Sequence, residues 1–466
     1  RVNCNLGRLD MAEKQKKIGI GLLGSGTVGE AVQDFVFQDA KGGDLQLEIV
    51  KIYTRHPKGK KWHASRASLF TTKAEEVIDH PDAEIIVEAL GFQDEKELSR
   101  FKDFIVAALK KGKAVVTSDK AVLAKHGGEI WRAARKYGGE LRFEACVAGG
   151  VPIIRSIMES FAAEEPEAIY GIVNGTCNYI LTEMARGGKS YESALTEAQE
   201  RGYAETNPAA DTNGKDAEAK LILLAAVTFG LQAEPGIFWR KGIEEIHALD
   251  FLYASRKGRS TIKHLAVARR DGDSIQAYVS PVLVPQEHFL AAIDGATNAL
   301  FFKAKRSGDA GRDWNYVFAG PGAGGGPTAV AILGDVYDVA RGRPRRGGPS
   351  ALVKSGALTV RAEDDIGACF YLRFIVKDRA GIVGDICQTL GDTGINISEI
   401  WQLSHSRDEL DALARRYRIA EKPDEILPFV ITLERASIGQ IKNAMKVIGA
   451  RDYMLAEPLW FPIWTG

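Results

Sequence analysis

The sequence has few cysteines, and no two of them stand at a spacing typical of a metal site or a redox motif. Five occur in 466 residues, at widely separated positions: Cys4, Cys146, Cys177, Cys369 and Cys387. An odd and sparse set of cysteines suits a reducing compartment better than a secreted scaffold held by disulfides. We therefore expect a cytoplasmic protein.

Long apolar runs and an excess of charge of one sign are also missing. The longest apolar stretch, 221–231, includes Thr228 and Gly230 and is shorter than the roughly 20 residues that span a bilayer. The first seventeen residues are polar and charged, so no secretory signal is expected. Lysine plus arginine and aspartate plus glutamate both number 61, which removes the electrostatic basis for general binding to nucleic acid or to a membrane surface.

What the chain does have is a hydrophobic content of 45%, enough for a sizeable core. Short apolar runs alternate with helical stretches from residue 17 to about residue 150, which indicates βαβ units and a parallel sheet. Helical periodicity dominates over 191–229, and strand-like alternation follows over 261–303. A glycine-rich loop at 318–327 is expected to open a helix at Thr328, and the basic, aperiodic stretch 341–349 is typical of a linker.

Three glycines form the pattern G-x-G-x-x-G after a predicted strand and at the start of a predicted helix. In this context the pattern indicates a dinucleotide-binding turn. Gly24 permits the tight turn, Gly26 lets a pyrophosphate approach the backbone, and Gly29 lets helix and strand pack closely. The helix start, with Thr27 and Val28, offers unpaired N–H groups to the phosphates. A turn without a ligand is the alternative.

The end of the second predicted strand bears on the choice of cofactor. An NAD site usually carries an acid there, about 20 residues after the glycines, for the ribose hydroxyls. The sequence YTRH instead places Arg55 at this point, with no acid available and three lysines downstream. We predict that Arg55 holds a 2′-phosphate and that NADP is favoured, while NAD stays open. An ordinary solvated basic loop is the alternative.

Acidic residues gather ahead of an apolar helix that follows residue 215. Asp216 and Lys220 stand four apart and share a helical face, where a surface salt bridge is the simplest interpretation. However, Lys220 borders LILLAAV, and burial lowers the pKa of a lysine towards the range useful for proton transfer. Asp216 opposes that shift, so both interpretations stay open. The segment NGTCNY at 174–179 predicts a turn and a helix cap.

Six segments, in this order, resemble homoserine dehydrogenase: GLLGSGTVGEAV, VTSDKAVLAKHG, FEACVAGGVPII, GIVNGTCNYILTEM, AQERGYAETNPAADTNGKDAEAKL and GPGAGGGPTAVA. The resemblance covers most of residues 17–341. It implies the reversible NAD(P)H-dependent reduction of L-aspartate 4-semialdehyde to L-homoserine, on the route to threonine and methionine. It also implies a monofunctional enzyme, because the chain has no room for the kinase half of bifunctional relatives.

The resemblance assigns roles to particular residues. Lys220 matches the general acid/base that protonates the aldehyde oxygen as hydride arrives, and Asp216 matches the acid that assists it. Lys120, in the TSDK motif, matches a lysine between cofactor and substrate and is a third catalytic candidate. The implied substrate-binding residues are Glu205, which would hold the substrate ammonium, Asp211, Tyr203, Thr176 and Lys120. The implied cofactor contacts are Gly24, Gly26, Thr27, Val28, Gly29, Arg55, Lys120 and Gly322.

The resemblance also implies a structural sodium ion. It would be bound by the backbone carbonyls of Glu144, Val147, Gly149 and Val151, at the hinge between the nucleotide and substrate domains. From spacing alone, this glycine-rich bend is a structural turn whose exposed carbonyls could bind a monovalent cation.

The last hundred residues show a βαββαβ pattern, and the segments DRAGI at 378–382 and GINI at 394–397 resemble an ACT domain. Such domains pair through their sheets and often bind an amino acid, so a homodimer or homotetramer and threonine as effector are expected. A helical insertion at 405–423, rich in charged residues, could displace or cap the effector site. A dimerisation module without a ligand is the alternative.

The predicted fold is therefore α/β, and two other functions remain alternatives. A phosphorylating semialdehyde dehydrogenase would need a cysteine nucleophile paired with a histidine, and the sequence around Cys146 indicates no such histidine. A non-catalytic amino-acid sensor would not need Lys220, Asp216 and Glu205 together. The predicted parts are an N-terminal extension (1–16), a Rossmann-type domain (17–150), an α+β substrate and dimerisation domain (151–317), a return segment (318–342), a linker (343–365) and an ACT-like domain with ferredoxin-like βαββαβ order (366–466).

Overall fold

The computed structural model describes residues 16–38, 45–91, 94–161, 163–305, 313–342 and 358–465. Residues 1–15 of the predicted extension and 343–357 of the predicted linker lie outside these ranges. The described chain divides into two compact units. The first unit contains the chain up to Asp119, Glu129–Ala145 and the segment that begins at Gly324, and the second contains the remainder. The finer six-part division stays a prediction.

The first unit contains, among the described residues, a six-stranded parallel sheet in the order β3-β2-β1-β4-β5-β6. This is the strand order of a dinucleotide-binding Rossmann fold. Strands β4 and β5 are buried along their whole length, as expected for a parallel sheet covered on both faces. The strands are β1 (Lys16–Leu23), β2 (Leu45–Tyr53), β3 (Phe70–Thr71), β4 (Ile85–Glu88), β5 (Ala114–Thr117) and β6 (Leu141–Arg142).

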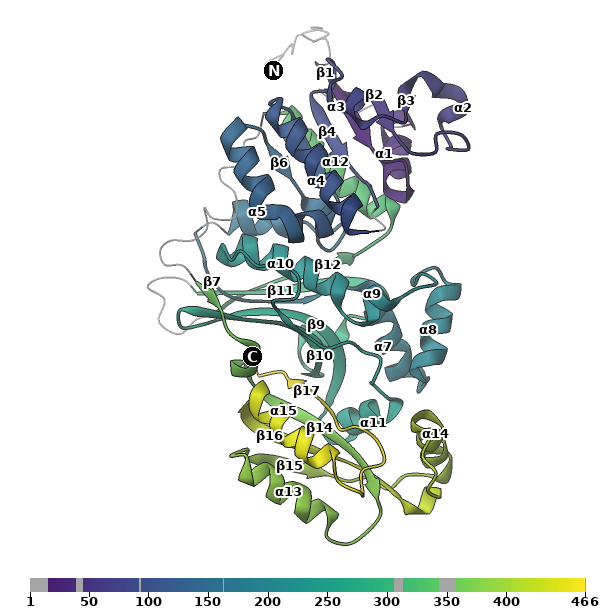
Figure 1. Cartoon of the computed structure of the whole chain (residues 1–466), viewed down its shortest axis with the longest axis vertical. Helices are drawn as coiled ribbons and strands as arrows, with labels where there is room; N and C mark the ends of the chain where they lie inside the picture. Colours follow the sequence, from purple (N-terminus) through teal and green to yellow (C-terminus); the bar gives the residue numbers. More distant parts are fainter. Residues whose placement is uncertain are drawn as a thin grey trace, which may run out of the picture. The chain divides into compact units, whose positions relative to one another are not determined.

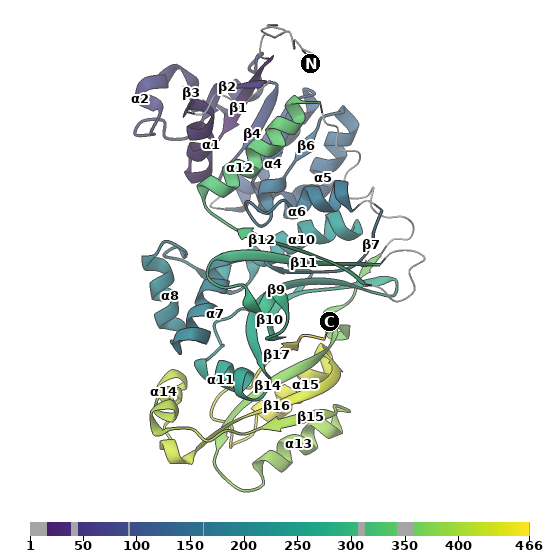
Figure 2. The same cartoon turned by 180° about the vertical axis from the view of Figure 1, so that it is seen from behind.

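Helices cover both faces of this sheet. Helix α4 lies over the face turned forward in Figure 1, and α12 lies beside α1 over the face turned forward in Figure 2. Helix α5 begins in the second unit, at Lys120, and continues into the first. The helices are α1 (Thr27–Gln38), α2 (His63–Arg66), α3 (Ala74–Ile78), α4 (Glu95–Lys110), α5 (Lys120–Tyr137) and α12 (Gly325–Ala340), with 3₁₀ turns η1 (Ala67–Leu69) and η2 (Glu144–Cys146).

The glycine-rich loop predicted at 318–327 is shorter in the structure, and this prediction is corrected. Strand β12 (Asp313–Pro321) runs through the first part, and α12 begins at Gly325 rather than at Thr328. Glycine is needed there because a Cβ on Gly325 would lie 2.9 Å from the carbonyl oxygen of Thr27 in α1. The absence of a side chain therefore lets the start of α12 approach α1 closely.

The second unit contains, within the described ranges, an eleven-stranded mixed sheet. Its main path is β12-β11-β7-β9-β10-β17-β14-β16-β15, while β8 and β13 pair with β10. The long hairpin of β9 and β10 forms the centre of this path. The strands besides β12 are β7 (Glu165–Ile172), β8 (Trp239–Arg240), β9 (Ser260–Asp271), β10 (Ser274–Pro285), β11 (Thr297–Lys305), β13 (Thr359–Val360), β14 (Gly367–Lys377), β15 (Ile397–Trp401), β16 (Ile426–Ser437) and β17 (Leu459–Ile463).

The helices of the second unit include α10, which is buried over almost its whole length and carries the acid-rich motif at its start. The α-helices are α6 (Ile153–Arg155), α7 (Gly175–Gly187), α8 (Tyr191–Glu200), α9 (Ala209–Thr212), α10 (Lys215–Phe229), α11 (Ala248–Arg256), α13 (Ile382–Asp392), α14 (Arg407–Tyr417) and α15 (Ile438–Gly449). The short turns are η3 (Ser156–Ser160), η4 (Phe289–Ala292), η6 (Glu363–Asp365) and η7 (Pro423–Glu425).

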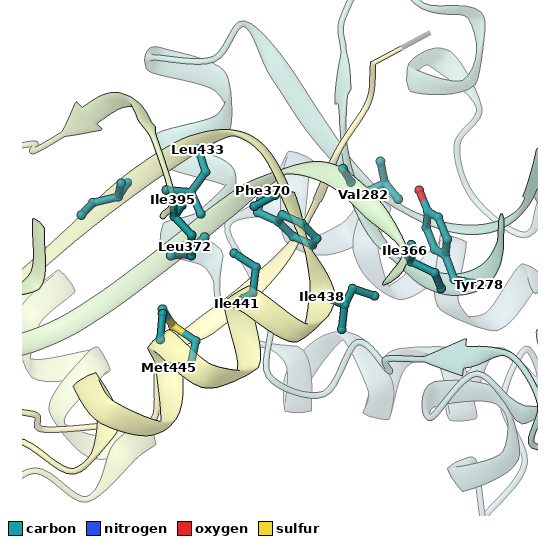
Figure 3. Packing of buried hydrophobic residues seen from close by; sticks show 14 of the residues in the cluster. Tyr278, Val282, Ile366, Phe370, Leu372, Ile395, Leu433, Ile438, Ile441 and Met445 are labelled. Atoms are coloured by element: carbon teal, nitrogen blue, oxygen red, sulfur yellow. The ribbon is translucent and has the colours of Figure 1, made fainter. Parts of the chain in front are cut away.

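The C-terminal segment follows the order βαββαβ and forms the sheet order β17-β14-β16-β15. It shares a hydrophobic core with β10, because Tyr278 and Val282 belong to the same buried cluster as Phe370 and Ile441 (Figure 3). The final strand runs from Leu459 to Ile463, since the preceding residues form turns, including a bond from the N–H of Met454 to the carbonyl of Arg451.

The predicted insertion folds as α14 and docks on the rest of the second unit. Arg416 Nη2 donates to the carbonyl oxygen of Glu244 at 2.6 Å. Beneath α14, the buried Arg373 of β14 pairs with Asp250 of α11 at 2.5 Å, and Tyr371 donates to the same carboxylate at 2.8 Å. The side chains of Arg373 and Asp250 are 1% and 0% exposed. The C-terminal segment is therefore joined to α11 by a fully buried charge pair.

Candidate functional site

The first candidate site is a cavity of about 320 Å³ at the carboxyl ends of the strands in the first unit. Its lining includes Gly24–Gly26 after β1, Tyr53–His56 at the end of β2 and Ala89–Gly91 after β4. A backbone hydrogen bond links the ends of β1 and β2: the N–H of Gly24 donates to the carbonyl oxygen of Tyr53 at 3.0 Å. In open α/β sheets, ligands bind in the crevice at this edge, where the strand order reverses.

The three motif glycines have distinct surroundings. Gly24 has a left-handed φ of 114°, and a Cβ there would lie 2.2 Å from the carbonyl oxygen of Ala89. A Cβ on Gly29 would lie 2.3 Å from the carbonyl oxygen of Gly24. At Gly26, a Cβ would meet no described atom within 4 Å. Gly24 and Gly29 are thus required by packing, whereas Gly26 leaves its backbone open towards the cavity, as a pyrophosphate requires.

Arg55 lines the same cavity, where it forms an ion pair with Glu97 of α4. The side chain of Arg55 is 48% exposed and that of Glu97 is 23% exposed. The sequence pattern did not indicate this acid, because it lies 42 residues beyond Arg55. Asp94, the N-cap of α4, accepts hydrogen bonds from the N–H groups of Lys96 and Glu97 and so fixes the start of this helix.

Glu88, at the end of β4, is a second acid that the sequence interpretation did not single out. It is fully buried, accepts a hydrogen bond from the Thr117 hydroxyl at 2.5 Å and another from the N–H of Leu90 at 2.8 Å. Burial, together with the nearby carboxylate of Asp119, raises the pKa of Glu88 from 4.5 to about 8. It therefore holds its proton at neutral pH and adds no negative charge there.

The second candidate site lies at the start of α10 in the second unit. Lys220 Nζ donates to Asp216 Oδ2 at 2.7 Å and to the carbonyl oxygen of Val173 at 2.6 Å. Lys120 Nζ lies 3.2 Å from the other oxygen of Asp216. The side chains of Lys220 and Asp216 are only 11% and 13% exposed, so the pair is not the surface salt bridge of the simplest interpretation.

Asn174 connects this cluster to a second carboxylate. Its side-chain amide donates to Asp211 at 2.8 Å and to Asp216 at 2.9 Å, while its amide oxygen accepts from the N–H of Cys177 and caps α7. The predicted helix cap is thus confirmed. The link to the two acids was missed, although an asparagine cap has two N–H donors that serine or aspartate caps lack.

Charge sets the protonation of the two acids in different ways. Burial opposes ionisation of Asp216, but the ammonium groups of Lys220 and Lys120 outweigh it and hold the pKa of Asp216 well below its usual value. Burial and the neighbouring Asp216 instead raise the pKa of Asp211. The cluster thus combines one firmly ionised carboxylate with a second, more basic one, next to two ammonium groups.

The other predicted substrate residues fall in two groups. The Thr176 hydroxyl donates to the carbonyl of Tyr203 at 2.6 Å and lies 3.4 Å from Asp211 Oδ2, within the cluster. The Tyr203 side chain is 46% exposed, and its ring packs against that of Tyr179 at 4.8 Å. Glu205 is exposed, and its backbone carbonyl accepts a bond from Gln199. Its carboxylate does not join the described Asp216 cluster.

The bend predicted to bind a cation is buried. Val147, Ala148 and Gly149 are buried, and the last two have left-handed φ values of 55° and 54°. A Cβ on Gly149 would lie 2.7 Å from the carbonyl oxygen of Gly322. Gly322 in turn lies against Asn298, whose buried amide oxygen and nitrogen have no hydrogen-bond partner among the described residues.

Comparisons with known proteins agree with this arrangement. The family model described as "Homoserine dehydrogenase, NAD binding domain" matches residues 24–144, and the model described as "Homoserine dehydrogenase" matches residues 152–337. A homoserine dehydrogenase of Pseudomonas aeruginosa is 32% identical over 94% of this chain and 96% of its own length. The chain belongs to the homoserine dehydrogenase family. It is accordingly an oxidoreductase with a nicotinamide-binding domain.

Two further homoserine dehydrogenases support this assignment. The protein of Bacillus subtilis is 34% identical over 85% of this chain and 90% of its own length. The crystal structure of a homoserine dehydrogenase from Thiobacillus denitrificans has a TM-score of 0.81 at 30% identity, covering 96% of this chain and 98% of that one. These relationships favour homoserine dehydrogenase over the sensor and over other semialdehyde dehydrogenases. None of the described helices is long and apolar enough to cross a membrane.

Proposed function

We propose that the chain reduces L-aspartate 4-semialdehyde to L-homoserine, reversibly, with Lys220 as the general acid/base. The observation that supports this role most directly is the pair of hydrogen bonds that hold the Lys220 ammonium, to Asp216 and to the Val173 carbonyl. An ammonium has three N–H donors, so one remains to serve a substrate oxygen. A bound NAD(P)H would supply the hydride.

In reduction, Lys220 Nζ transfers a proton to the aldehyde oxygen while the aldehyde carbon receives the hydride. The product is the homoserine hydroxyl, and the neutral amine left on Lys220 regains a proton from solvent. In oxidation the same amine takes the hydroxyl proton. Asp216 assists by fixing Lys220 between two acceptors, and it remains an anion throughout because its pKa is held low.

The remaining acids and lysines bind and orient the substrate in this proposal. Lys120 adds a second positive charge beside Asp216, where it would attract the substrate carboxylate. Asp211 and Thr176 would form the polar wall of the substrate site, and Tyr203 its exposed edge. The carboxylate of Glu205, which is exposed to solvent, would bind the substrate ammonium.

For the cofactor, we propose NADP as the favoured form, with NAD also accepted. The glycine turn, with Thr27 and Val28, would bind the pyrophosphate. Arg55 would bind the 2′-phosphate, for which a guanidinium is well suited. Lys120 and Gly322 remain proposed contacts at the nicotinamide end.

We also propose a structural sodium ion in the bend that contains Val147, Gly149 and Val151. Backbone carbonyl oxygens are hard ligands of the kind that hard cations prefer, and the neighbouring Asn298, whose amide has no hydrogen-bond partner among the described residues, would offer another oxygen. Val147, Gly149 and Val151 would hold the ion, and it would fix the bend. Glu144, the fourth predicted ligand, belongs to the first unit, where its N–H donates to Asp335 at 2.9 Å, and its part in the site stays a prediction.

For the C-terminal segment we propose an ACT-type regulatory role with threonine as effector, in a homodimer or homotetramer. The βαββαβ order supports the fold of such a domain. The position of α14, bonded to the 244–245 backbone, supports a role in capping. A cytoplasmic location and a place in threonine and methionine synthesis complete the proposal.

The first test is homoserine-dependent reduction of NADP⁺ and, in parallel, NAD⁺, followed by the absorbance of the reduced nicotinamide. Turnover with NADP⁺ favoured is expected. Turnover favouring NAD⁺ would keep the reaction but discard the role of Arg55. Folded protein that binds nucleotide and turns over neither would contradict the proposed function.

A further inference from the structure

Among the described residues that line the cavity of the first unit, one is an acid, Glu97. This acid forms an ion pair with Arg55, the residue predicted to bind the 2′-phosphate. We propose that Glu97 is a specificity-determining residue, which competes with a cofactor 2′-phosphate for Arg55 and so sets the balance between NADP and NAD. This inference rests on the proposed function, because it concerns the cofactor of that reaction.

The position of Glu97 is fixed by the helix that carries it. The Asp94 carboxylate caps α4 through the N–H of Glu97 at 2.9 Å, and Glu97 lies in the first helical turn. A carboxylate there is favoured by the positive end of the helix dipole. Glu97 is therefore fixed in position on the cavity wall, where it pairs with Arg55.

NADP and NAD would interact differently with the pair of Arg55 and Glu97, because one carries a 2′-phosphate and the other a 2′-hydroxyl. A 2′-phosphate carries a charge of nearly −2 at neutral pH and must draw Arg55 away from Glu97, which then remains beside it as a like charge. A 2′-hydroxyl is uncharged and can donate to the Glu97 carboxylate while Arg55 stays paired. Glu97 thus opposes NADP and assists NAD, whereas Arg55 acts in the opposite sense.

The exchange is feasible because the pair is only partly buried. With Arg55 half exposed, water screens the attraction, and such pairs are readily broken. The lining also contains Lys60 and Arg100, so positive charge outweighs the single carboxylate. Lys60 Nζ itself lies 3.4 Å from Glu30 Oε1 of α1. The site is therefore able to accept a phosphate, but Glu97 lowers its affinity for one.

The test compares two ligands that differ only in the 2′-phosphate, adenosine 2′,5′-bisphosphate and adenosine 5′-monophosphate, binding to the full chain by calorimetry. In Glu97→Gln, affinity for the bisphosphate should rise roughly three- to tenfold, while affinity for the monophosphate should stay the same or fall. Arg55→Gln should do the reverse and weaken the bisphosphate alone. Glu95→Gln, an exposed residue in the same helical turn, is the matched control and should change neither.

An equal change in both affinities in Glu97→Gln, or no change in the bisphosphate, would overturn the inference. The ratio of kcat/KM for NADP⁺ to that for NAD⁺ should move with the binding data, rising in Glu97→Gln. Because the binding measurements need no turnover, failure of homoserine oxidation would contradict the proposed function while the ligand pair still decides the role of Glu97.

Discussion

The two candidate sites use ion pairs in opposite ways. At the start of α10, Asp216 lies between Lys220 and Lys120 in a cluster that is largely removed from water, and Asn174 adds hydrogen bonds to it. In the first unit, the pair of Arg55 and Glu97 lies in an open cavity, partly in solvent.

The difference follows from what each chemistry requires. A proton-transfer group has to be held in one geometry, and low dielectric strengthens every interaction that holds it. A residue that admits a charged ligand has to exchange one partner for another, which is easier where solvent screens the first partner. Substitutions in the buried cluster should therefore have large effects on rate, and those in the cavity small effects on preference.

The largest effect is expected for Lys220→Ala. Loss of the general acid/base should lower kcat by about 10²- to 10⁴-fold, while cofactor binding stays unchanged. Lys120→Ala should act mainly on KM for homoserine, because it is placed to attract the substrate carboxylate. Steady-state kinetics with calorimetry of cofactor binding separates the two lysines. Unchanged turnover in Lys220→Ala would show that the assignment is wrong.

The next largest effect is expected on the free energy of unfolding, when the buried pair of Arg373 and Asp250 is broken. This pair has no proposed catalytic role. Asp250→Asn leaves the guanidinium of the fully buried Arg373 without its anion, and such a loss costs about 3–5 kcal/mol of unfolding free energy. Urea-induced unfolding measures it. Glu245→Gln, which removes an exposed i,i+4 pair with Lys241, is the control and should cost under about 0.5 kcal/mol. Similar costs for both variants would contradict the comparison.

Asn174→Ser tests whether the cluster depends on its bridging amide. Serine keeps the helix cap but loses the two donors to Asp211 and Asp216, so kcat/KM should fall about ten- to a hundredfold with little change in melting temperature. These donors lower the pKa of both acids, so their loss should move the acid limb of the pH profile to higher pH. An unmoved limb with reduced stability would indicate a structural role alone.

Much of the first unit could be predicted from the sequence because its signals are local. The predicted alternation of strands and helices is confirmed from β1 through α1 to β2, and the glycine turn follows its strand as the pattern requires. The partners of Arg55 and Asn174 could not be predicted in this way. Glu97 lies 42 residues from Arg55, and Asp216 lies 42 residues from Asn174, so only the tertiary fold brings each pair together.

Glu88 provides a comparison within the first unit, since it is more deeply buried than Asp216 but has no cation to pair with among the contacts that set its pKa. Its folded-state pKa of about 8 lies above the ordinary 4.5, so the folded state binds the extra proton between these values. Stability should therefore fall as pH rises from 4.5 to 8, by up to about 1.4 kcal/mol per pH unit. Glu88→Gln should remove this slope in melting temperature against pH. Parallel curves for the two proteins would contradict the prediction.

The smallest effect on stability is expected for the partly exposed pair of Arg55 and Glu97 in the first unit. Glu97→Gln should change the free energy of unfolding by under about 1 kcal/mol, because a partly exposed ion pair contributes little to stability. Its effect on NADP against NAD should be visible all the same, since cofactor preference depends on the difference between two bound states and not on the strength of the pair itself. Urea-induced unfolding beside the calorimetry would decide this. A loss of stability near that of Asp250→Asn would mean that the Arg55 and Glu97 pair is structural, and that the two sites do not differ in the way their exposure indicates.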